Sequence, residues 1–392
     1  MENPLLNIEI QRFINDNIGV DIAKLALAKN PFSDVIWTEI LNQITVKSKI
    51  KDKLPAFFAT PNILYPSKIS SEQTSSELAA IYKSELISGE SLIDLTGGFG
   101  VDTYFFSKKI KHVIHCEIDS ELSQIVAHNF KVLNAKNVEF HQGDSFEILK
   151  SLNRKIDVIY IDPSRRNAFK GKVFMLKDCL PNVPELLDFY FNYSNSILIK
   201  TAPILDISAG LLELKNVKCI HVVAVNNEVK ELLWEIEKSY SGVTRIKTVN
   251  LLKEKKISFE FDLNNSGIAT YSFPQKYLYE PNSAIMKSGG FDEISAFYQL
   301  PKLHSHSHLY TSETCIEFPG RIFEIKSSFS YTKTNMKQYL EGKKANLTIR
   351  NFPDTVEIIR KKWKINDGGE SYCFFTTDLN NDKIVLICNK IS

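Results

Sequence analysis

The sequence lacks several features that would place the protein in a special class. Its six cysteines form no CxxC pair, which argues against a zinc site and a disulfide framework. No apolar run approaches the ~18–20 residues that span a bilayer. The N-terminus has no basic segment followed by an apolar one, so we expect no secretory signal. We therefore expect reduced, mostly buried thiols, no membrane segment and a cytoplasmic location.

The sequence also has little excess of one charge over the other. The formal net charge of +2 rules out a whole-chain argument for nucleic-acid binding, although basic residues gather around Arg165–Arg166 and around Arg360–Lys364. Hydrophobic residues make up 43% and charged residues 24%, the balance of a globular protein. The chain has 392 residues, whereas single cores stop growing near ~250–300 residues, so we expect two to four domains.

The spacing of apolar residues changes along the chain. Up to about residue 70 they recur every three or four positions, which predicts helices. From residue 91 to about 225, short β-rich runs alternate with helical stretches, the pattern of a parallel sheet with helices on both faces. After about residue 236 the runs are mostly strands, with a further small unit from about 320. An α/β fold results, and such sheets bind ligands beyond the carboxyl ends of their strands.

The strongest motif is IDLTGGFGVDT at 93–103. It places Asp94 at a strand end, followed by Thr96 and by glycines that let the backbone approach a ligand, namely Gly97, Gly98 and Gly100. A plain turn and a dinucleotide loop are the alternatives. Asp94 would repel an anionic pyrophosphate, and the third glycine of G-x-G-x-x-G falls on Thr103. The charge therefore favours a cationic cofactor, S-adenosylmethionine.

Two further strand ends carry carboxylates. Glu117 ends HVIHCE and suits the ribose hydroxyls, a role that Asp119 could share. Asp144 follows VEFHQG and can accept the adenine amine, with Ser145 placed to cap the next helix. Each also has a purely structural explanation, a solvated charge for Glu117 and a helix cap for Asp144. The prediction of a donor site therefore rests on the occurrence of such residues at three successive strand ends.

The fourth strand ends in IDPSRR, which predicts the acceptor side. Asp162 and Pro163 are the candidate catalytic residues, since Pro163 breaks the strand and Asp162 can hold the nucleophile or accept its proton. Because Asp162 is presented beside the donor, it is also a candidate cofactor-binding residue. Arginines bind phosphate well, although ordinary ion pairs are the alternative for them. The lysine that closes SILIK faces the same rim or is simply exposed. The candidate substrate-binding residues are Ser164, Arg165, Arg166 and Lys200.

A cysteine and a group of histidines are weaker candidates for a functional site. Cys179 lies near no base, so a buried, inert thiol is favoured over a nucleophile. His304, His306 and His308 alternate along the chain, but no cysteine or carboxylate cluster accompanies them. We favour an exposed polar segment there over a metal site. We expect no bound metal.

The motifs resemble those of class I S-adenosylmethionine-dependent methyltransferases. Nearly the whole chain is similar to bacterial THUMP-like-domain methyltransferases of the Bacteroidetes type. The segments that carry this narrower likeness are SSEQTSSELAAIYKSE (70–85), TAPILDIS (201–208), VNNEVKELLW (225–234), YLYEPNSAIMKSGG (277–290) and ANLTIRNFPDTVEIIRKKWKINDGGE (345–370). The resemblance implies an N-terminal helical region (1–72), a Rossmann-like domain (73–235), a ferredoxin-like α+β domain (236–319) and a THUMP-like domain (320–392).

The resemblance also implies an RNA acceptor, because THUMP domains of better-known enzymes bind RNA. One departure concerns the acceptor motif, where Ser164 and Arg165 replace the second proline and the aromatic residue of exocyclic-amine methyltransferases. That difference argues against methylation of an exocyclic amine, since no aromatic clamps a flipped base. The alternatives are a protein or small-molecule methyltransferase, a catalytically silent RNA-binding protein and, more distantly, an NAD-dependent enzyme.

Overall fold

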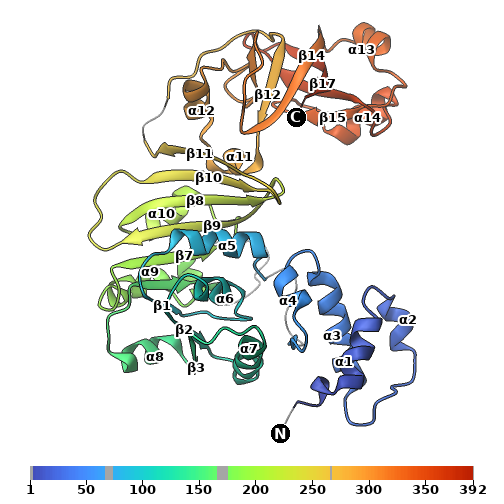
Figure 1. Cartoon of the computed structure of the whole chain (residues 1–392). Helices are drawn as coiled ribbons and strands as arrows, with labels where there is room; N and C mark the ends of the chain where they lie inside the picture. Colours follow the sequence, from blue (N-terminus) through green and yellow to red (C-terminus); the bar gives the residue numbers. More distant parts are fainter. Residues whose placement is uncertain (1–2, 67–73, 166–174, 265–266, 392) are drawn as a thin grey trace. The chain divides into compact units, whose positions relative to one another are not determined.

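The computed structural model describes residues 3–66, 74–165, 175–264 and 267–391, apart from the side chain of Arg165. The chain divides into two compact units (Figure 1). Unit 1 is formed by Met1–Lys218 and Glu231–Gly242, and unit 2 by Cys219–Lys230 and Val243–Ser392. The chain therefore passes from unit 1 to unit 2 at residue 219, returns to unit 1 at residue 231 and enters unit 2 again at residue 243. The four-domain division stays a prediction.

Short helices open unit 1. They are η1 (Pro4–Leu6), α1 (Ile8–Asp16), α2 (Ile22–Ala26), α3 (Trp37–Ile50) and α4 (Pro55–Ala59). Ile10, Ile14, Ile40 and Ile44 pack together in their core, as the three- and four-residue spacing predicts. The side chain of Asn129 bonds both the N–H and the C=O of Leu64, at 2.9 Å each, and so fastens this helical region to the neighbouring helix α7.

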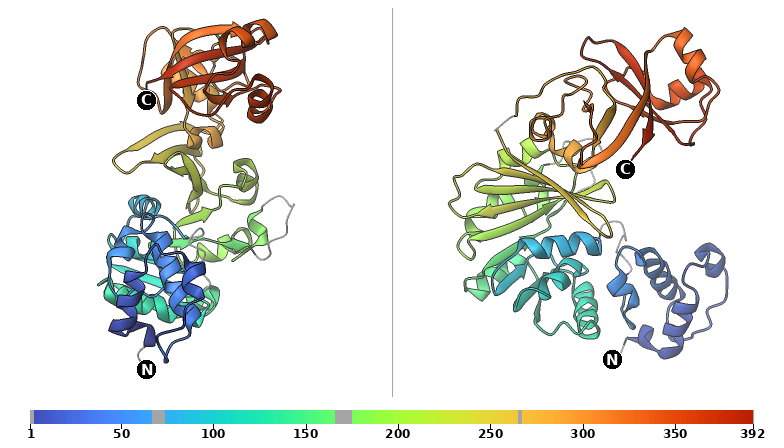
Figure 2. Two further views of the ribbon diagram at one scale, coloured as in Figure 1. Left: turned by 90° about the vertical axis from the view of Figure 1, so that its right-hand side faces the viewer. Right: turned by 45° about the horizontal axis from the view of Figure 1, so that its top comes forward.

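A twisted sheet forms the centre of unit 1, with strands in the order β9-β7-β4-β1-β2-β3 (Figure 2). The parallel strands are β1 (Ser91–Asp94), β2 (His112–Glu117), β3 (Val138–Gln142), β4 (Val158–Ile161) and β7 (Ser196–Thr201). Their accompanying helices are α5 (Glu77–Leu86), α6 (Val101–Ser107), α7 (Ser120–Val132), α8 (Ser145–Leu152), α9 (Val183–Tyr190) and α10 (Ile207–Glu213). Every residue of β4 is buried, as expected for a strand covered on both faces. The predicted α/β class is confirmed.

One strand of unit 1 breaks the parallel arrangement. Strand β9 (Glu228–Glu237), which follows the stretch from 91 to about 225 where the sequence predicted a parallel sheet, runs antiparallel to β7. Beyond β4, the short strands β5 (Ser164–Arg165) and β6 (Cys179–Leu180) pair with each other, and η2 (Leu176–Asp178) precedes β6.

Unit 2 contains strands of two sheets. Strand β8 (Val217–Val225) pairs in parallel with β10 (Arg245–Leu251), which pairs antiparallel with β11 (Lys256–Asp262). A six-stranded sheet follows in the order β13-β12-β14-β17-β16-β15. Its strands are β12 (Tyr277–Pro281), β13 (Tyr310–Ser312), β14 (Gly320–Ser330), β15 (Asn346–Ile349), β16 (Ser371–Thr377) and β17 (Lys383–Lys390). The helices of unit 2 are α11 (Ser283–Ser288), α12 (Phe291–Tyr298), α13 (Lys333–Tyr339) and α14 (Val356–Trp363).

Among the described helices, none has the length and apolar character required to cross a membrane.

Candidate functional site

A cavity of about 280 Å³ opens at the carboxyl ends of the strands of unit 1. Its position agrees with the general rule for parallel α/β sheets. The predicted site residues that line it are Asp94, Thr96, Gly97, Gly98, Gly100, Asp162, Ser164 and Lys200. The lining residues that the sequence did not single out are Thr74, Ser75, Phe99, Val101, Asp102, Leu122 and Tyr160. Donor-side and acceptor-side candidates therefore meet at one cavity.

The glycine loop between β1 and α6 forms one wall of this cavity. A Cβ on Gly97 would lie 2.2 Å from His115 Nε2, and a Cβ on Gly100 would lie 2.8 Å from the ring of Phe130. Gly98 and Gly100 also have positive φ angles of 55° and 78°. The loop therefore presents backbone to the cavity, because side chains beneath it leave no room for a Cβ.

Asp94 lies at the end of β1, 1% exposed. Its Oδ1 accepts a hydrogen bond from the Thr96 N–H at 3.0 Å, and its Oδ2 accepts one from the Thr103 hydroxyl at 2.7 Å. Burial raises the pKa of Asp94 to about 7, outweighing these two bonds, and the charges of Asp102 and Asp162 add to the increase. A cation in the cavity would relieve the cost of ionising this carboxylate.

The other predicted donor carboxylates lie outside the cavity lining. Glu117 is linked to it, because its Oε2 accepts the Gly98 N–H at 2.9 Å and its Oε1 accepts the Asp119 N–H at 2.8 Å. Asp119 caps α7. Asp144 caps α8 by accepting from the N–H groups of Phe146 and Glu147. The prediction that Ser145 is the cap is therefore wrong, because Asp144 precedes it in that position.

The acceptor side is built by the ends of β4 and β7. Lys200 forms an ion pair with Asp162 Oδ2, and the Asp162 N–H donates to Thr96 Oγ1 at 2.6 Å. Burial opposes the charge of Lys200, but Asp162, Asp102 and Glu231 outweigh it and raise the pKa of Lys200. The alternative of a simply exposed Lys200 is wrong, since 13% of its side chain is exposed.

The rest of the acceptor motif is described in part. Pro163 is buried and Ser164 is exposed at the start of β5. The Arg165 side chain and all of Arg166 lie outside the described residues. Their predicted contacts with phosphate stay predictions.

A buried ionic network, which sequence reasoning missed, lies beside the cavity. Lys83 Nζ is 2.7 and 2.8 Å from the two carboxylate oxygens of Glu231, and 3.3 Å from Asp102 Oδ1. The Tyr160 hydroxyl donates to Asp102 Oδ2 at 2.7 Å, and the Ser75 hydroxyl does so at 3.0 Å. Lys83 is completely buried. A signal for Asp102 was available, since it follows Gly100 closely in the donor motif.

The minor candidates have structural explanations. Cys179 is buried, as predicted. The histidine segment is a turn, not a strand. His304 is hydrogen-bonded to the side chains of Asn351 and Asn381, and His308 stacks on Phe291 with ring centroids 3.5 Å apart. Of the three histidines only His306 is exposed, so the predicted exposed segment is wrong for the other two.

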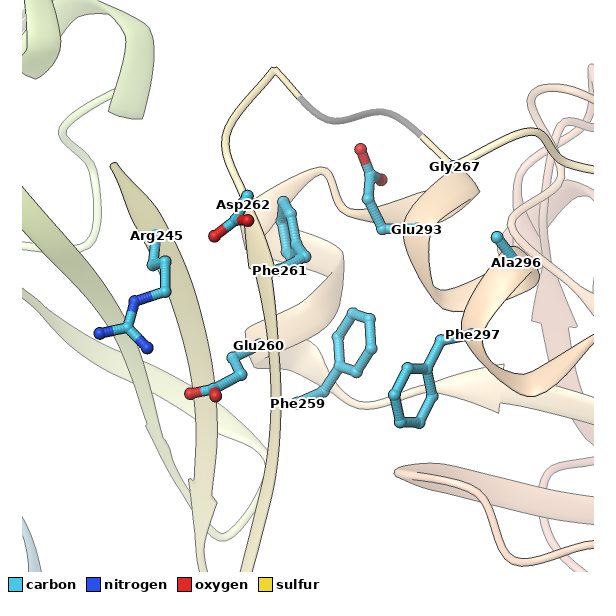
Figure 3. Close-up of a pocket in the computed structure, with 9 residues that line it drawn as sticks. All are labelled: Arg245, Phe259, Glu260, Phe261, Asp262, Gly267, Glu293, Ala296 and Phe297. Atoms are coloured by element: carbon cyan, nitrogen blue, oxygen red, sulfur yellow. The ribbon is translucent and has the colours of Figure 1, made fainter. Parts of the chain in front are cut away.

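A second hollow, of about 500 Å³, lies in unit 2 (Figure 3). Phe259 and Phe261 of β11 point toward α12, which contributes Phe297 and Glu293. Arg245 also belongs to its lining, which lacks the residues that the sequence marks for chemistry. The cavity of unit 1 is therefore the candidate functional site.

Known proteins similar to this chain indicate its family. Family models match at residues 277–319, described as a ferredoxin-like domain, and at residues 320–390, described as THUMP domain-like. Two Clostridium proteins, each named as an uncharacterized RNA methyltransferase, match short segments. The one from Clostridium tetani is 30% identical over 95 residues, which are 24% of this chain and 21% of that protein.

The second, from Clostridium acetobutylicum, is 32% identical over 79 residues, 20% of this chain and 17% of that protein. The chain thus spans about a fifth of the length of these relatives. A crystal structure described as a methyltransferase from Porphyromonas gingivalis W83 matches throughout, with 30% identity, a TM-score of 0.86 and 98% of each chain covered. The chain therefore belongs to the methyltransferase family that this Porphyromonas gingivalis protein represents.

Proposed function

We propose that the protein transfers a methyl group from S-adenosylmethionine to RNA. The observation that carries the proposal is the cavity of unit 1, in which a glycine-rich loop lies beside a buried carboxylate that favours a cation. This methyl donor bears a cationic sulfonium and a cationic amino group, so its charge complements the cavity.

The residues present fit the donor. Gly97 and Gly100 have no room for a Cβ because they pack against the buried side chains of His115 and Phe130, which fixes the loop backbone beside the cavity. Asp94 and Glu117 would hold the donor, the first through its charge and the second beside the Gly98 N–H. When bound, S-adenosylmethionine supplies an electrophilic methyl group. Asp119, Asp144 and Ser145 remain proposed contacts at the outer rim.

On the acceptor side, Asp162 orients the nucleophile. Lys200 occupies one carboxylate oxygen of Asp162 and Thr96 binds its N–H, so the side chain is fixed and its other oxygen can accept a proton from the acceptor. Pro163 directs the backbone at this point. Ser164 lines the cavity, and we propose that it contacts the acceptor together with Arg165 and Arg166, which follow it in the sequence.

Two features support RNA as the acceptor. The Clostridium relatives are named as RNA methyltransferases, and the family model at 320–390 is described as THUMP domain-like. The last turn of α14 and the residue after it also present exposed basic side chains, namely Lys361, Lys362 and Lys364. Such residues bind phosphate without regard to sequence. An RNA acceptor would place the enzyme in the cytoplasm.

The test uses donor labelled with tritium in its methyl group. RNA from cells that lack this protein should take up label from the wild-type enzyme, whereas Asp162→Ala should transfer at least about 100-fold less. Both proteins should bind donor, which separates chemistry from binding. Label entering only protein or small molecules would reject the RNA acceptor. RNA binding without any transfer would favour the catalytically silent alternative.

A further inference from the structure

Among the residues that the structure describes, the charged side chains around the unit 1 cavity do not balance. Lys83 and Lys200 are its buried or nearly buried cations, with side chains 0% and 13% exposed. Three carboxylates form ion pairs with them, those of Glu231, Asp102 and Asp162. The group therefore carries one excess negative charge before Asp94 is counted. Buried charge without a partner is costly, and such sites are concentrated where a protein binds or reacts.

The contacts assign this excess charge to Asp102. Lys200 is engaged by Asp162, and Lys83 is held by both oxygens of Glu231 at 2.7 and 2.8 Å. Asp102 Oδ1 is farther from Lys83, at 3.3 Å, and it has no hydrogen-bond partner among the described residues. Asp102 also lines the cavity, whereas Lys83 and Glu231 do not.

The surrounding groups keep Asp102 charged and fixed. Burial opposes ionisation, but Lys83 and Lys200 outweigh it and hold the pKa of Asp102 below its ordinary value. The hydroxyls of Tyr160 and Ser75 both donate to Oδ2, so the carboxylate cannot rotate freely. A fixed negative charge in a poorly hydrated wall acts strongly on an ion in the cavity.

We propose that Asp102 makes the site prefer a positively charged sulfur donor over the neutral thioether product. This inference rests on the proposed donor. S-adenosylmethionine and S-adenosylhomocysteine differ by one methyl group and one positive charge on sulfur. A carboxylate that belongs to a group with net negative charge attracts the first and contributes little to the second, so product leaves readily after transfer. Lys83 and Glu231 are positioning residues, because they set how much of Asp102's charge reaches the cavity.

The experiment measures dissociation constants by calorimetry for two unreactive ligands. Sinefungin carries an ammonium in place of the sulfonium, and S-adenosylhomocysteine is neutral at that point. Wild-type protein should bind sinefungin about tenfold more tightly than S-adenosylhomocysteine, a difference of about 1.4 kcal/mol. Asp102→Asn should bring the ratio of the two constants close to one, mainly by weakening sinefungin.

Two further variants distinguish charge from structure. Glu231→Gln leaves Asp102 as the only carboxylate paired with Lys83 among the described residues, so it should also reduce the preference although Glu231 is not in the cavity lining. Ser75→Ala removes one hydrogen bond to Asp102 and one from Lys83 without removing charge, and it should change both constants by the same factor. Thermal unfolding of each variant, monitored alongside, should show a cooperative transition near that of the wild type.

The outcomes separate this inference from the proposed function. Binding of neither ligand by the wild type would overturn the donor assignment and this inference with it. Binding of both ligands with an unchanged ratio in Asp102→Asn would overturn the role of Asp102 alone. An equal loss of both ligands in that variant would also overturn it, since it would show that Asp102 only maintains the shape of the site.

Discussion

Each unit of the molecule buries a carboxylate among basic side chains, and the two arrangements differ in where their excess charge lies. In unit 2, Glu280 is 2% exposed and is bonded by both Arg321 and Arg350. These arginines outnumber it and have side chains 36% and 31% exposed. The surplus positive charge there reaches solvent.

In unit 1 the surplus is negative and belongs to a carboxylate on the cavity wall. Water can relieve the charge on the exposed arginines, whereas the charge on Asp102 and Asp94 awaits a ligand. The comparison teaches that burial of charge does not by itself mark a functional site. The informative feature is whether the excess charge faces solvent or a cavity. The following experiments test this distinction.

The largest effect is expected from Asp94→Asn. Loss of the carboxylate should weaken sinefungin binding at least about 100-fold, or roughly 3 kcal/mol. The same change should make the unliganded protein more stable at pH 8 by about 1–3 kcal/mol. The folded-state pKa of about 7 lies above the unfolded value, so the ionised carboxylate destabilises the fold as pH rises through this range. Urea denaturation with and without ligand measures both changes.

A stability gain together with unchanged ligand affinity would contradict the donor role of Asp94. A loss of stability in the variant would contradict the conclusion that the ionised, buried Asp94 destabilises the fold.

The converse variant is Glu280→Gln in unit 2. Removing the anion leaves Arg321 and Arg350 facing each other, so the unfolding free energy should fall by about 2 kcal/mol, less than for a fully buried pair because both arginines reach water. Sinefungin affinity should stay within about twofold of the wild type. Glu324→Gln on the same sheet, where the carboxylate pairs with half-exposed Lys326, is the matched control and should show no measurable change. Loss of ligand binding in Glu280→Gln would contradict the conclusion that the buried carboxylate of unit 2 is structural and that of unit 1 binds the ligand.

The pH dependence of ligand binding provides a third test. Because Asp94 has a pKa of about 7, sinefungin affinity at pH 6 should be about tenfold lower than at pH 8. The pKa of His115 is about 4 after burial, that of Asp102 lies below its ordinary value and that of Lys200 above, so these neighbours do not titrate between pH 6 and 8. Calorimetry across this range should show the slope in the wild type and a flat profile in Asp94→Asn. A slope that persists in the variant would assign the proton elsewhere.

The smallest effect is expected from Lys111→Ala. Lys111 pairs with Glu90 on the surface of unit 1, with side chains 68% and 69% exposed. Solvent screening should limit the change in unfolding free energy to about 0.5 kcal/mol or less. Both ligand constants should be unchanged. A larger change in the unfolding free energy would contradict the small contribution expected of an exposed ion pair. A change in either ligand constant would mean that such a pair affects the site.

The donor loop could be predicted from sequence because its features are local. Asp94 and the three glycines lie within seven residues, and a strand before them and a helix after them fix their position. The end of β4 was found in the same way, since the strand ends at Ile161 and Asp162 and Pro163 follow directly. Parallel pairing of β1 with β4 then places both ends at one edge.

The ionic network could not be predicted in this way. Lys83 and Glu231 are separated by 148 positions, and nothing in either local sequence indicates that both side chains are buried. Their partnership requires β9 to lie beside β7, and β9 was the strand that the alternating pattern did not reveal. Ser145 shows the opposite failure, because adjacent residues with similar capping ability are hard to distinguish locally.

The fit of Gly97 over His115 restricts how this family can diverge. The imidazole is fully buried, and its Nε2 occupies the space that any larger residue at 97 would need. A homologue that acquires alanine at 97 must therefore carry a smaller side chain at 115. The two positions should be inherited as a pair, and chimaeras that exchange one without the other should lose the shape of the loop.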